Sequence, residues 1–88
     1  MFYVYFLLLS NKNIYTGSTS NLKQRFNEHK TGKVRSTKPF LPIKLIGYEA
    51  YIKKTDALRR EKYLKTTEGK RLFRQQYRDI ILESKTEL

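Results

Sequence analysis

The sequence contains no cysteine. This absence excludes disulfide bonds, thiol nucleophiles and thiolate metal sites together. It suits a reducing compartment, and we expect a cytoplasmic protein. The chain also lacks internal repeats, linkers and low-complexity tracts, and its 88 residues are too few to enclose two separate cores. We therefore expect a single domain over residues 1–88.

A hydrophobic run long enough to cross a membrane is absent too. The apolar opening, residues 2–9, is too short to span a bilayer and has no basic start. It leads directly into hairpin-like sequence. We interpret it as a core strand and expect no membrane association.

Acidic residues are scarce. The chain has 8 Asp plus Glu against 19 Lys plus Arg, which gives a formal net charge of +11. Such a surface attracts polyanions over a distance that salt limits. Nucleic acid is the first candidate partner. An anionic membrane surface is a weaker candidate, because the basic residues are spread along the chain instead of gathered beside an amphipathic anchor.

Three segments have the composition of strands. Residues 2–9 are aromatic, aliphatic and β-branched without polar alternation, which predicts a central strand covered on both faces. The turn-prone residues 10–13 and a short strand over residues 14–17 complete a hairpin. A third strand fits residues 43–52.

The first helix is predicted from residues 18–21, which are rich in helix N-cap side chains. It should run to about Lys30 with Leu22 and Phe26 on its apolar stripe, and Gly32 should end it. A basic loop without apolar periodicity follows. Its cations are candidates for contact with a phosphate backbone: Lys30, Lys33, Arg35 and Lys38.

A second helix should begin near Thr55 and Asp56, with Glu61 on the same inward stripe as Ala57, Leu58 and Leu64. Gly69 is expected to break the chain. A third helix then follows with an apolar stripe, and residues 84–88 should fray. That stripe comprises Leu72, Phe73, Tyr77, Ile80 and Ile81. The fold class is α+β, a small three-stranded antiparallel sheet flanked by helices in the order β-β-α-β-α-α.

Glu61 is the most informative single residue. A carboxylate on an inward stripe is costly unless it is paired or bound to a cation. Mg²⁺ often takes only one or two protein carboxylates, with water and substrate phosphate completing its shell. From spacing alone, an internal salt bridge or a slightly rotated, exposed helix is the more usual explanation of such a glutamate.

Arg25 and His29 lie one turn apart and should project together from the first helix. Arginine suits phosphate contact, and histidine can move a proton near neutral pH. An ordinary basic helix face with a solvated histidine is the alternative. Tyr5 and Tyr15 fall in predicted strands, where tyrosines are usually core residues with a bonded hydroxyl.

Taken together, these residues resemble the GIY-YIG nuclease superfamily, in particular its small stand-alone members related to the nuclease domain of the bacterial excision-repair system. The resemblance covers roughly residues 2–75. The first motif, usually Gly-Ile-Tyr, is Tyr3-Val4-Tyr5, and the second, usually Tyr-Ile-Gly, is Tyr15-Thr16-Gly17. The matching positions then continue in order through Arg25, His29 and Glu61.

By this resemblance the chain is expected to be a divalent-metal-dependent endonuclease that cuts nucleic acid, with DNA favoured over RNA and a role in repair or recombination. Glu61 would hold one Mg²⁺ or Mn²⁺, and Arg25 would stabilise the transition-state charge. Tyr5 would help activate water, Tyr15 would orient water or phosphate, and His29 would assist proton transfer or hold the scissile phosphate. A monomer or weak dimer is expected.

The chain departs from the family pattern at two places. Many relatives carry a lysine just after the second motif, where this chain has Ser18, and many carry a late asparagine that Gln75 or Gln76 would have to replace. An inactive nucleic-acid-binding module with the same basic surface is therefore the main alternative. A basic protein that docks on an anionic protein or on ribosomal RNA is another.

Overall fold

The structure is a computed structural model that describes residues 1–86. Three antiparallel strands form one sheet in the order β2-β1-β3. Their bounds are β1 Phe2–Leu8, β2 Ile14–Thr19 and β3 Lys44–Tyr51. The helices are α1 Leu22–Lys30, a short 3₁₀ turn η1 Lys38–Phe40, α2 Lys54–Leu64, α3 Thr67–Gln76 and α4 Arg78–Thr86. The predicted class and the three-stranded sheet are confirmed.

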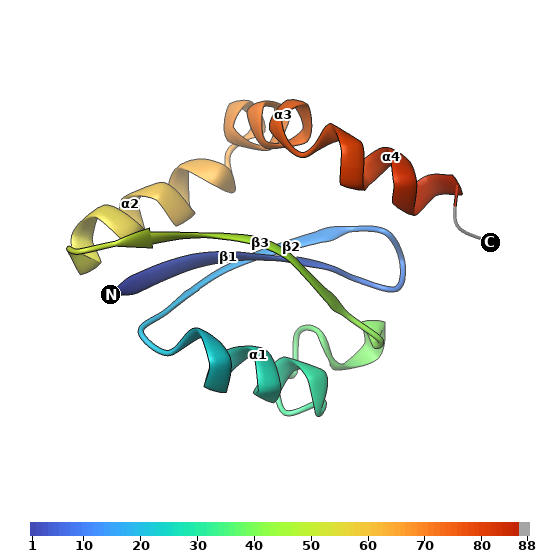
Figure 1. Cartoon of the computed structure of the whole chain (residues 1–88), viewed down its shortest axis with the longest axis horizontal. Helices are drawn as coiled ribbons and strands as arrows, with labels where there is room; N and C mark the ends of the chain where they lie inside the picture. Colours follow the sequence, from blue (N-terminus) through green and yellow to red (C-terminus); the bar gives the residue numbers. More distant parts are fainter. Residues whose placement is uncertain (87–88) are drawn as a thin grey trace.

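The molecule has three layers, with α1 on one face of the sheet and α2, α3 and α4 on the other (Figure 1). Side chains of β1 alternate between the two faces. Val4 and Phe6 pack with α2 and α3, whereas Tyr5 and Leu7 pack on the side of α1. All four are almost completely buried. The expectation of a central strand covered on both faces is confirmed.

The second strand is longer than predicted. Ser18 and Thr19 pair with Val4 and Tyr3 of β1, so they belong to the sheet and not to the start of a helix. The N-cap of α1 is Asn21, whose side chain accepts the backbone N–H of Gln24. Cross-strand pairing therefore overrides the capping preference of two of the four predicted cap residues.

The helix α1 ends as expected. Thr31 is its C-cap, and Gly32 follows with φ +77°, a left-handed conformation that glycine adopts without steric cost. The predicted basic loop is present, but it is not uniformly solvated. Val34 and Thr37 are buried, and they tie the loop to the body of the protein.

Gly69 does not break the chain, contrary to the prediction. It lies inside α3, and the break falls earlier, where the Thr66 hydroxyl caps α3 by accepting the N–H of Gly69. The glycine is needed for close approach, because a Cβ at this position would lie 2.0 Å from the carbonyl oxygen of Tyr63. The predicted third helix is instead divided at Tyr77, which stacks on Phe73.

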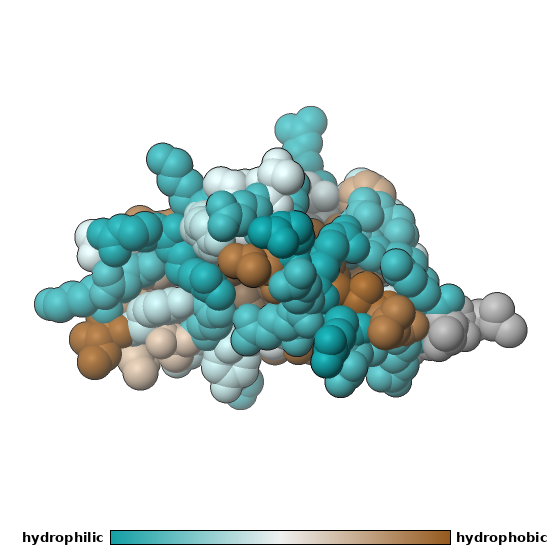
Figure 2. Space-filling model, turned by 90° about the horizontal axis from the view of Figure 1, so that it is seen from above, coloured by the Kyte–Doolittle hydropathy of each residue, from teal (hydrophilic) through white to brown (hydrophobic). Residues whose placement is uncertain are grey.

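Two leucines predicted to face inward are exposed. Leu58 is 44% exposed and Leu72 is 41% exposed. The inward face of α2 is narrow, with Ala57 and Leu64 buried, and α3 presents Gly69 and Phe73 to the core. The face seen in Figure 2 is hydrophilic over most of its area, and its apolar patches are separate from one another.

The C-terminal segment is more ordered than expected. Residues through 86 continue α4, and Ser84 is buried with its hydroxyl bonded to the carbonyl of Ile81. The prediction that residues 84–88 fray is wrong for residues 84–86, and residues 87 and 88 lie outside the described part. No helix of the described residues is long and apolar enough to cross a membrane.

Replacing Gly69 with alanine should destabilise the protein, although alanine is the better helix former by about 1 kcal/mol. The added methyl meets backbone atoms of Tyr63 and Leu64, which cannot rotate away. We expect a loss of roughly 2 kcal/mol in the free energy of unfolding, measured by urea denaturation. The exposed neighbour change Lys70→Ala should stay within about 0.5 kcal/mol. Equal stability of Gly69→Ala and wild type would show that the helix junction is loose.

Candidate active site

The two tyrosine motifs meet because of one missing side chain. Tyr5 and Gly17 are directly opposed in the β1–β2 ladder. A Cβ at position 17 would lie 2.5 Å from the Tyr5 hydroxyl oxygen. Glycine therefore leaves the space in which the Tyr5 ring lies across β2.

Tyr5 begins a buried chain of hydrogen bonds. Its hydroxyl oxygen lies 2.8 Å from Nε2 of His29, and Nδ1 of His29 lies 2.8 Å from the Thr37 hydroxyl oxygen. The Thr37 hydroxyl in turn donates to the carbonyl oxygen of Val34 at 3.4 Å. His29 and Thr37 are completely buried and Tyr5 is 1% exposed. His29 is thus not a solvated surface histidine. The series of hydrogen bonds links Tyr5 of β1, through His29 of α1, to the basic loop.

The surroundings assign the protons in this chain. The Thr37 hydroxyl donates to the carbonyl oxygen of Val34, so toward Nδ1 of His29 it acts as an acceptor. Nδ1–H then donates to Thr37, and Nε2 accepts the hydroxyl proton of Tyr5. His29 is therefore the neutral Nδ1–H tautomer.

The pKa shifts agree with this assignment. Burial raises the pKa of Tyr5 to about 12, against a smaller lowering by Arg25, so the phenol keeps its proton at neutral pH. Burial, followed by the positive charge of Arg25, lowers the pKa of His29. The imidazole is accordingly neutral and free to accept a proton.

Tyr15 and Arg25 complete the cluster on this face. The Tyr15 ring centroid lies 5.1 Å from that of His29 and 6.3 Å from that of Tyr5. Tyr15 is only half-buried, so it is the more accessible phenol of the pair. The Arg25 side chain is 38% exposed and forms an ion pair with Glu28 at 3.1 Å. The structure brings four of the five predicted catalytic residues together around His29.

Glu61 approaches the cluster from α2, past the edge strand β2. Its side chain is 19% exposed. Oε1 accepts a hydrogen bond from the Ser18 hydroxyl at 2.8 Å, and Oε2 forms an ion pair with Lys65 at 3.1 Å. The charge of Glu61 is close enough to raise the pKa of Tyr5 slightly. Ser18, the departure from the family pattern, therefore holds the carboxylate in place.

The donor set suits one ion that is completed by water and substrate. Within residues 1–86, no three His, Asp or Glu side chains gather into a cage. Glu61 is a single carboxylate at a partly open position, and each of its oxygens accepts one protein hydrogen bond. Mg²⁺ and Mn²⁺ are bound in this way when substrate phosphate supplies further ligands.

The remaining predicted residues lie on the loop that begins at the end of α1 and at the end of α3. The four cations Lys30, Lys33, Arg35 and Lys38 are all exposed, as a role in binding a phosphate backbone requires. Gln75 and Gln76 line a groove with Arg60 and Arg78 at the end of α3, away from the cluster.

Comparison with known proteins agrees with the motifs. The GIY-YIG catalytic domain matches residues 1–77. The chain belongs to the GIY-YIG family. A UPF0213 protein of Streptococcus agalactiae is 38% identical over 80 residues, covering 88% of this chain and 91% of the relative. A UPF0213 protein of Haloquadratum walsbyi is 32% identical, covering 89% and 91%.

The solved structures support the same family. The solution NMR structure of a UPF0213 protein from Bacillus halodurans superposes with a TM-score of 0.53 at 30% identity, covering 83% of this chain and 82% of the other. These relatives make the chain a small GIY-YIG protein similar to the UPF0213 proteins. A closer relation to the excision-repair nuclease stays a prediction.

Two residues of the site were missed in the sequence. Thr37 fixes the His29 tautomer, and Ser18 was noted only as a departure from the family pattern. Val34 and Thr37 are the residues of the basic loop that are buried. The sequence signal for this burial is their three-residue spacing within a polar loop. That pattern is weak, and it does not identify His29 as the partner of Thr37.

The buried histidine predicts a pH dependence of stability. Because its folded pKa lies below the ordinary value of about 6.5, the unfolded chain binds the proton more readily. The stabilisation is present above about pH 6.5 and is lost as the pH falls through the folded pKa. Arg25 and Glu28 are the charges that act on His29. Denaturation midpoints should therefore drop as the pH falls below about 6.5, and less steeply in His29→Gln. Parallel curves for the two proteins would contradict a neutral, buried His29.

Proposed function

We propose that this GIY-YIG protein is a divalent-metal-dependent endonuclease that hydrolyses phosphodiester bonds, with DNA as its substrate. The observation that carries the proposal is the convergence of Tyr5, Tyr15, Arg25 and His29 on one side of β2 and the Glu61 carboxylate on the other. Membership of a family of catalytic domains supports it.

The buried hydrogen bonds suit proton removal from the attacking water. Tyr5 holds its own proton at neutral pH, so it acts by passing that proton to Nε2 of His29 as it takes one from water. The hydroxide attacks phosphorus, the bond to the leaving oxygen breaks, and that oxygen takes up a proton from solvent water. His29 is left as the imidazolium, which returns its proton to solvent through Tyr5. Thr37 stabilises that charge by continuing to accept the hydrogen bond that Nδ1–H donates.

Arg25 and Tyr15 face the substrate in this proposal. Arg25 is partly exposed and directed by Glu28, so its guanidinium is available to the phosphate that becomes more negative in the transition state. Tyr15, with its accessible phenol, orients the phosphate or the water. Glu61 would hold Mg²⁺ or Mn²⁺, which supplies charge neutralisation at the phosphate. Ser18 keeps the carboxylate in position.

The basic loop is proposed as the surface that binds the nucleic-acid backbone. Its cations are exposed, while the buried Val34 and Thr37 hold the loop against the body of the protein. Thr37 also bonds His29, so the backbone-binding surface and the proton relay share one anchor. With 19 basic residues in 88, binding with little sequence preference is expected.

Substitution of Glu61 should separate cutting from binding. Labelled single-stranded, duplex, flap and branched DNA, with matching RNA, would be incubated in Mg²⁺, Mn²⁺ or EDTA. Glu61→Gln keeps an oxygen for Ser18 but loses the charge, and we expect cleavage to fall at least about 100-fold with little change in affinity. The exposed Glu68→Gln is the matched control and should cut normally.

Tyr5→Phe tests the proton relay in the same assay. This substitution should also stop cleavage while binding remains, because no phenol is left to transfer a proton from water to His29. If the wild-type protein binds every substrate and cuts none in either metal, the nuclease proposal is wrong and the protein is an inactive nucleic-acid-binding module.

The loop cations should set the salt dependence of binding. Each lost contact with duplex DNA lowers the slope of log affinity against log salt by about 0.9. The double variant Lys33→Ala and Arg35→Ala should therefore lose a slope of about 1.8. The control, Lys70→Ala with Lys85→Ala, removes the same charge from α3 and α4, which lie on the opposite face of the sheet from α1. This control should change the salt-dependence slope far less. Equal losses in both would indicate a surface without a defined binding face.

A further inference from the structure

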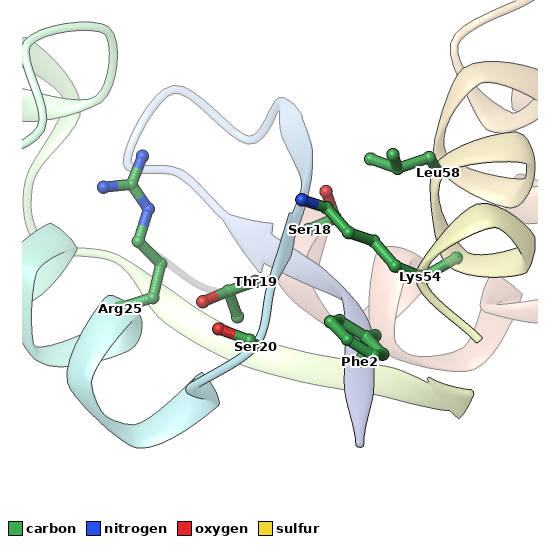
Figure 3. Close-up of a pocket in the computed structure, with 8 residues that line it drawn as sticks. Phe2, Ser18, Thr19, Ser20, Arg25, Lys54 and Leu58 are labelled. Carbon is green, nitrogen blue, oxygen red and sulfur yellow. The ribbon is translucent and has the colours of Figure 1, made fainter. Parts of the chain in front are cut away.

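A pocket of about 410 Å³ opens beside the catalytic cluster (Figure 3). Arg25 of α1 stands on one side of it and Lys54 of α2 on the other, with the end of β2 between them. The remaining lining comprises Phe2, Ser18, Thr19, Ser20, Ala57 and Leu58. Among the described residues, no acidic side chain lines the pocket. Its charge and its hydroxyl groups therefore favour an anion.

Lys54 differs from the two arginines of α2, which both form ion pairs. Arg59 pairs with Asp56, and Arg60 pairs with Glu49. Lys65, which follows α2, pairs with Glu61. Within residues 1–86, Lys54 forms no ion pair, and its ammonium points over the pocket toward Ser18 (Figure 3). It also lies in the first turn of α2, where the helix dipole favours an anion. An unpaired cation in this position is available for a ligand.

The position of Lys54 along α2 connects it with the catalytic site. Lys54 and Glu61 are seven residues apart, which is about two turns, so they share one helix face. The exposed Leu58 lies between them on that face and forms an apolar wall of the pocket with Phe2. A ligand that extends from Arg25 and Glu61 into the pocket would place a second anionic group at Lys54.

We propose that this pocket is a substrate subsite, in which Lys54 binds a backbone phosphate next to the one that is cut. A nucleic-acid strand has the required repeat of phosphates, and its sugar can pack on Phe2 and Leu58. This inference rests on the proposed function for the identity of the polyanion. It assigns to Lys54 a role in positioning the substrate that the family motifs do not include.

The test is equilibrium binding in EDTA of a flap DNA, whose junction gives the bound protein a fixed register, with one phosphate at a time replaced by an uncharged methylphosphonate. Wild type should show one position outside the scissile phosphate where the replacement weakens binding about tenfold. Lys54→Ala should lose a similar factor on unmodified DNA and become insensitive at that position. Lys54→Arg should retain the sensitivity. The slope of log affinity against log salt should fall by about 0.9 in Lys54→Ala.

Lys62→Ala is the matched control, because Lys62 is exposed, lies on the same helix, forms no ion pair within residues 1–86 and does not line the pocket. It should keep full sensitivity at the same phosphate. If Lys54→Ala also keeps that sensitivity while wild type cuts DNA, the subsite is wrong and the nuclease stands. If wild type binds but does not cut, a loss of sensitivity in Lys54→Ala still supports the subsite. If wild type binds no nucleic acid, both proposals fall.

Discussion

The hydrogen bond between Tyr5 and His29 is the interaction on which the rest of the site depends. Both side chains are removed from water, so each polar group must find a partner inside the protein or cost about 1–3 kcal/mol. That requirement sets the rotation of α1 against the sheet. It also sets the path of the following loop, because the second nitrogen of His29 must meet Thr37.

This arrangement shows how a domain of 88 residues can hold a buried polar network. The network lies within the smaller of the two cores, between Leu7, Leu9 and the side chains of α1. The larger core is built around Phe6 and Phe73 and is hydrophobic. The buried hydrogen bonds and the larger hydrophobic core therefore lie on opposite faces of β1, whose alternate side chains point to one face or the other. A central strand is the element of so small a fold that can contribute to both layers.

The sequence predicted the sheet and most helices because their signals are local. The apolar run of β1, the hairpin and the stripe of α1 each depend on a few neighbouring residues. Gly69 was misinterpreted because glycine also serves close approach, and whether a glycine is needed for that depends on what lies beside it. The division of the last helix at Tyr77 has no local signal, since it follows contacts of that ring with Phe6 and Phe73.

The sequence predicted which side chains could form a candidate site, but it did not predict the contacts that join them. Five residues in the right order and in the right elements resembled one family. Each of them alone was also consistent with an ordinary structural role, such as a core tyrosine or a surface ion pair. Helical spacing placed Glu61 on an inward face, yet it could not show that Ser18 would bond it from β2. Nor could spacing show that His29 is fully buried or that a loop threonine sets its tautomer. Such partners come from different elements, and their meeting is fixed only by the packed fold.

The contact between Tyr5 and Gly17 has an evolutionary consequence. The two residues belong to different motifs, but they fill one volume, since the tyrosine ring occupies the space of the absent side chain. A larger residue at position 17 is tolerable only if position 5 shrinks, and a protein that loses the tyrosine releases the glycine from constraint. The two positions should therefore change together among homologues. A decayed, non-catalytic descendant would lose the tyrosine first and could then gain a side chain at position 17.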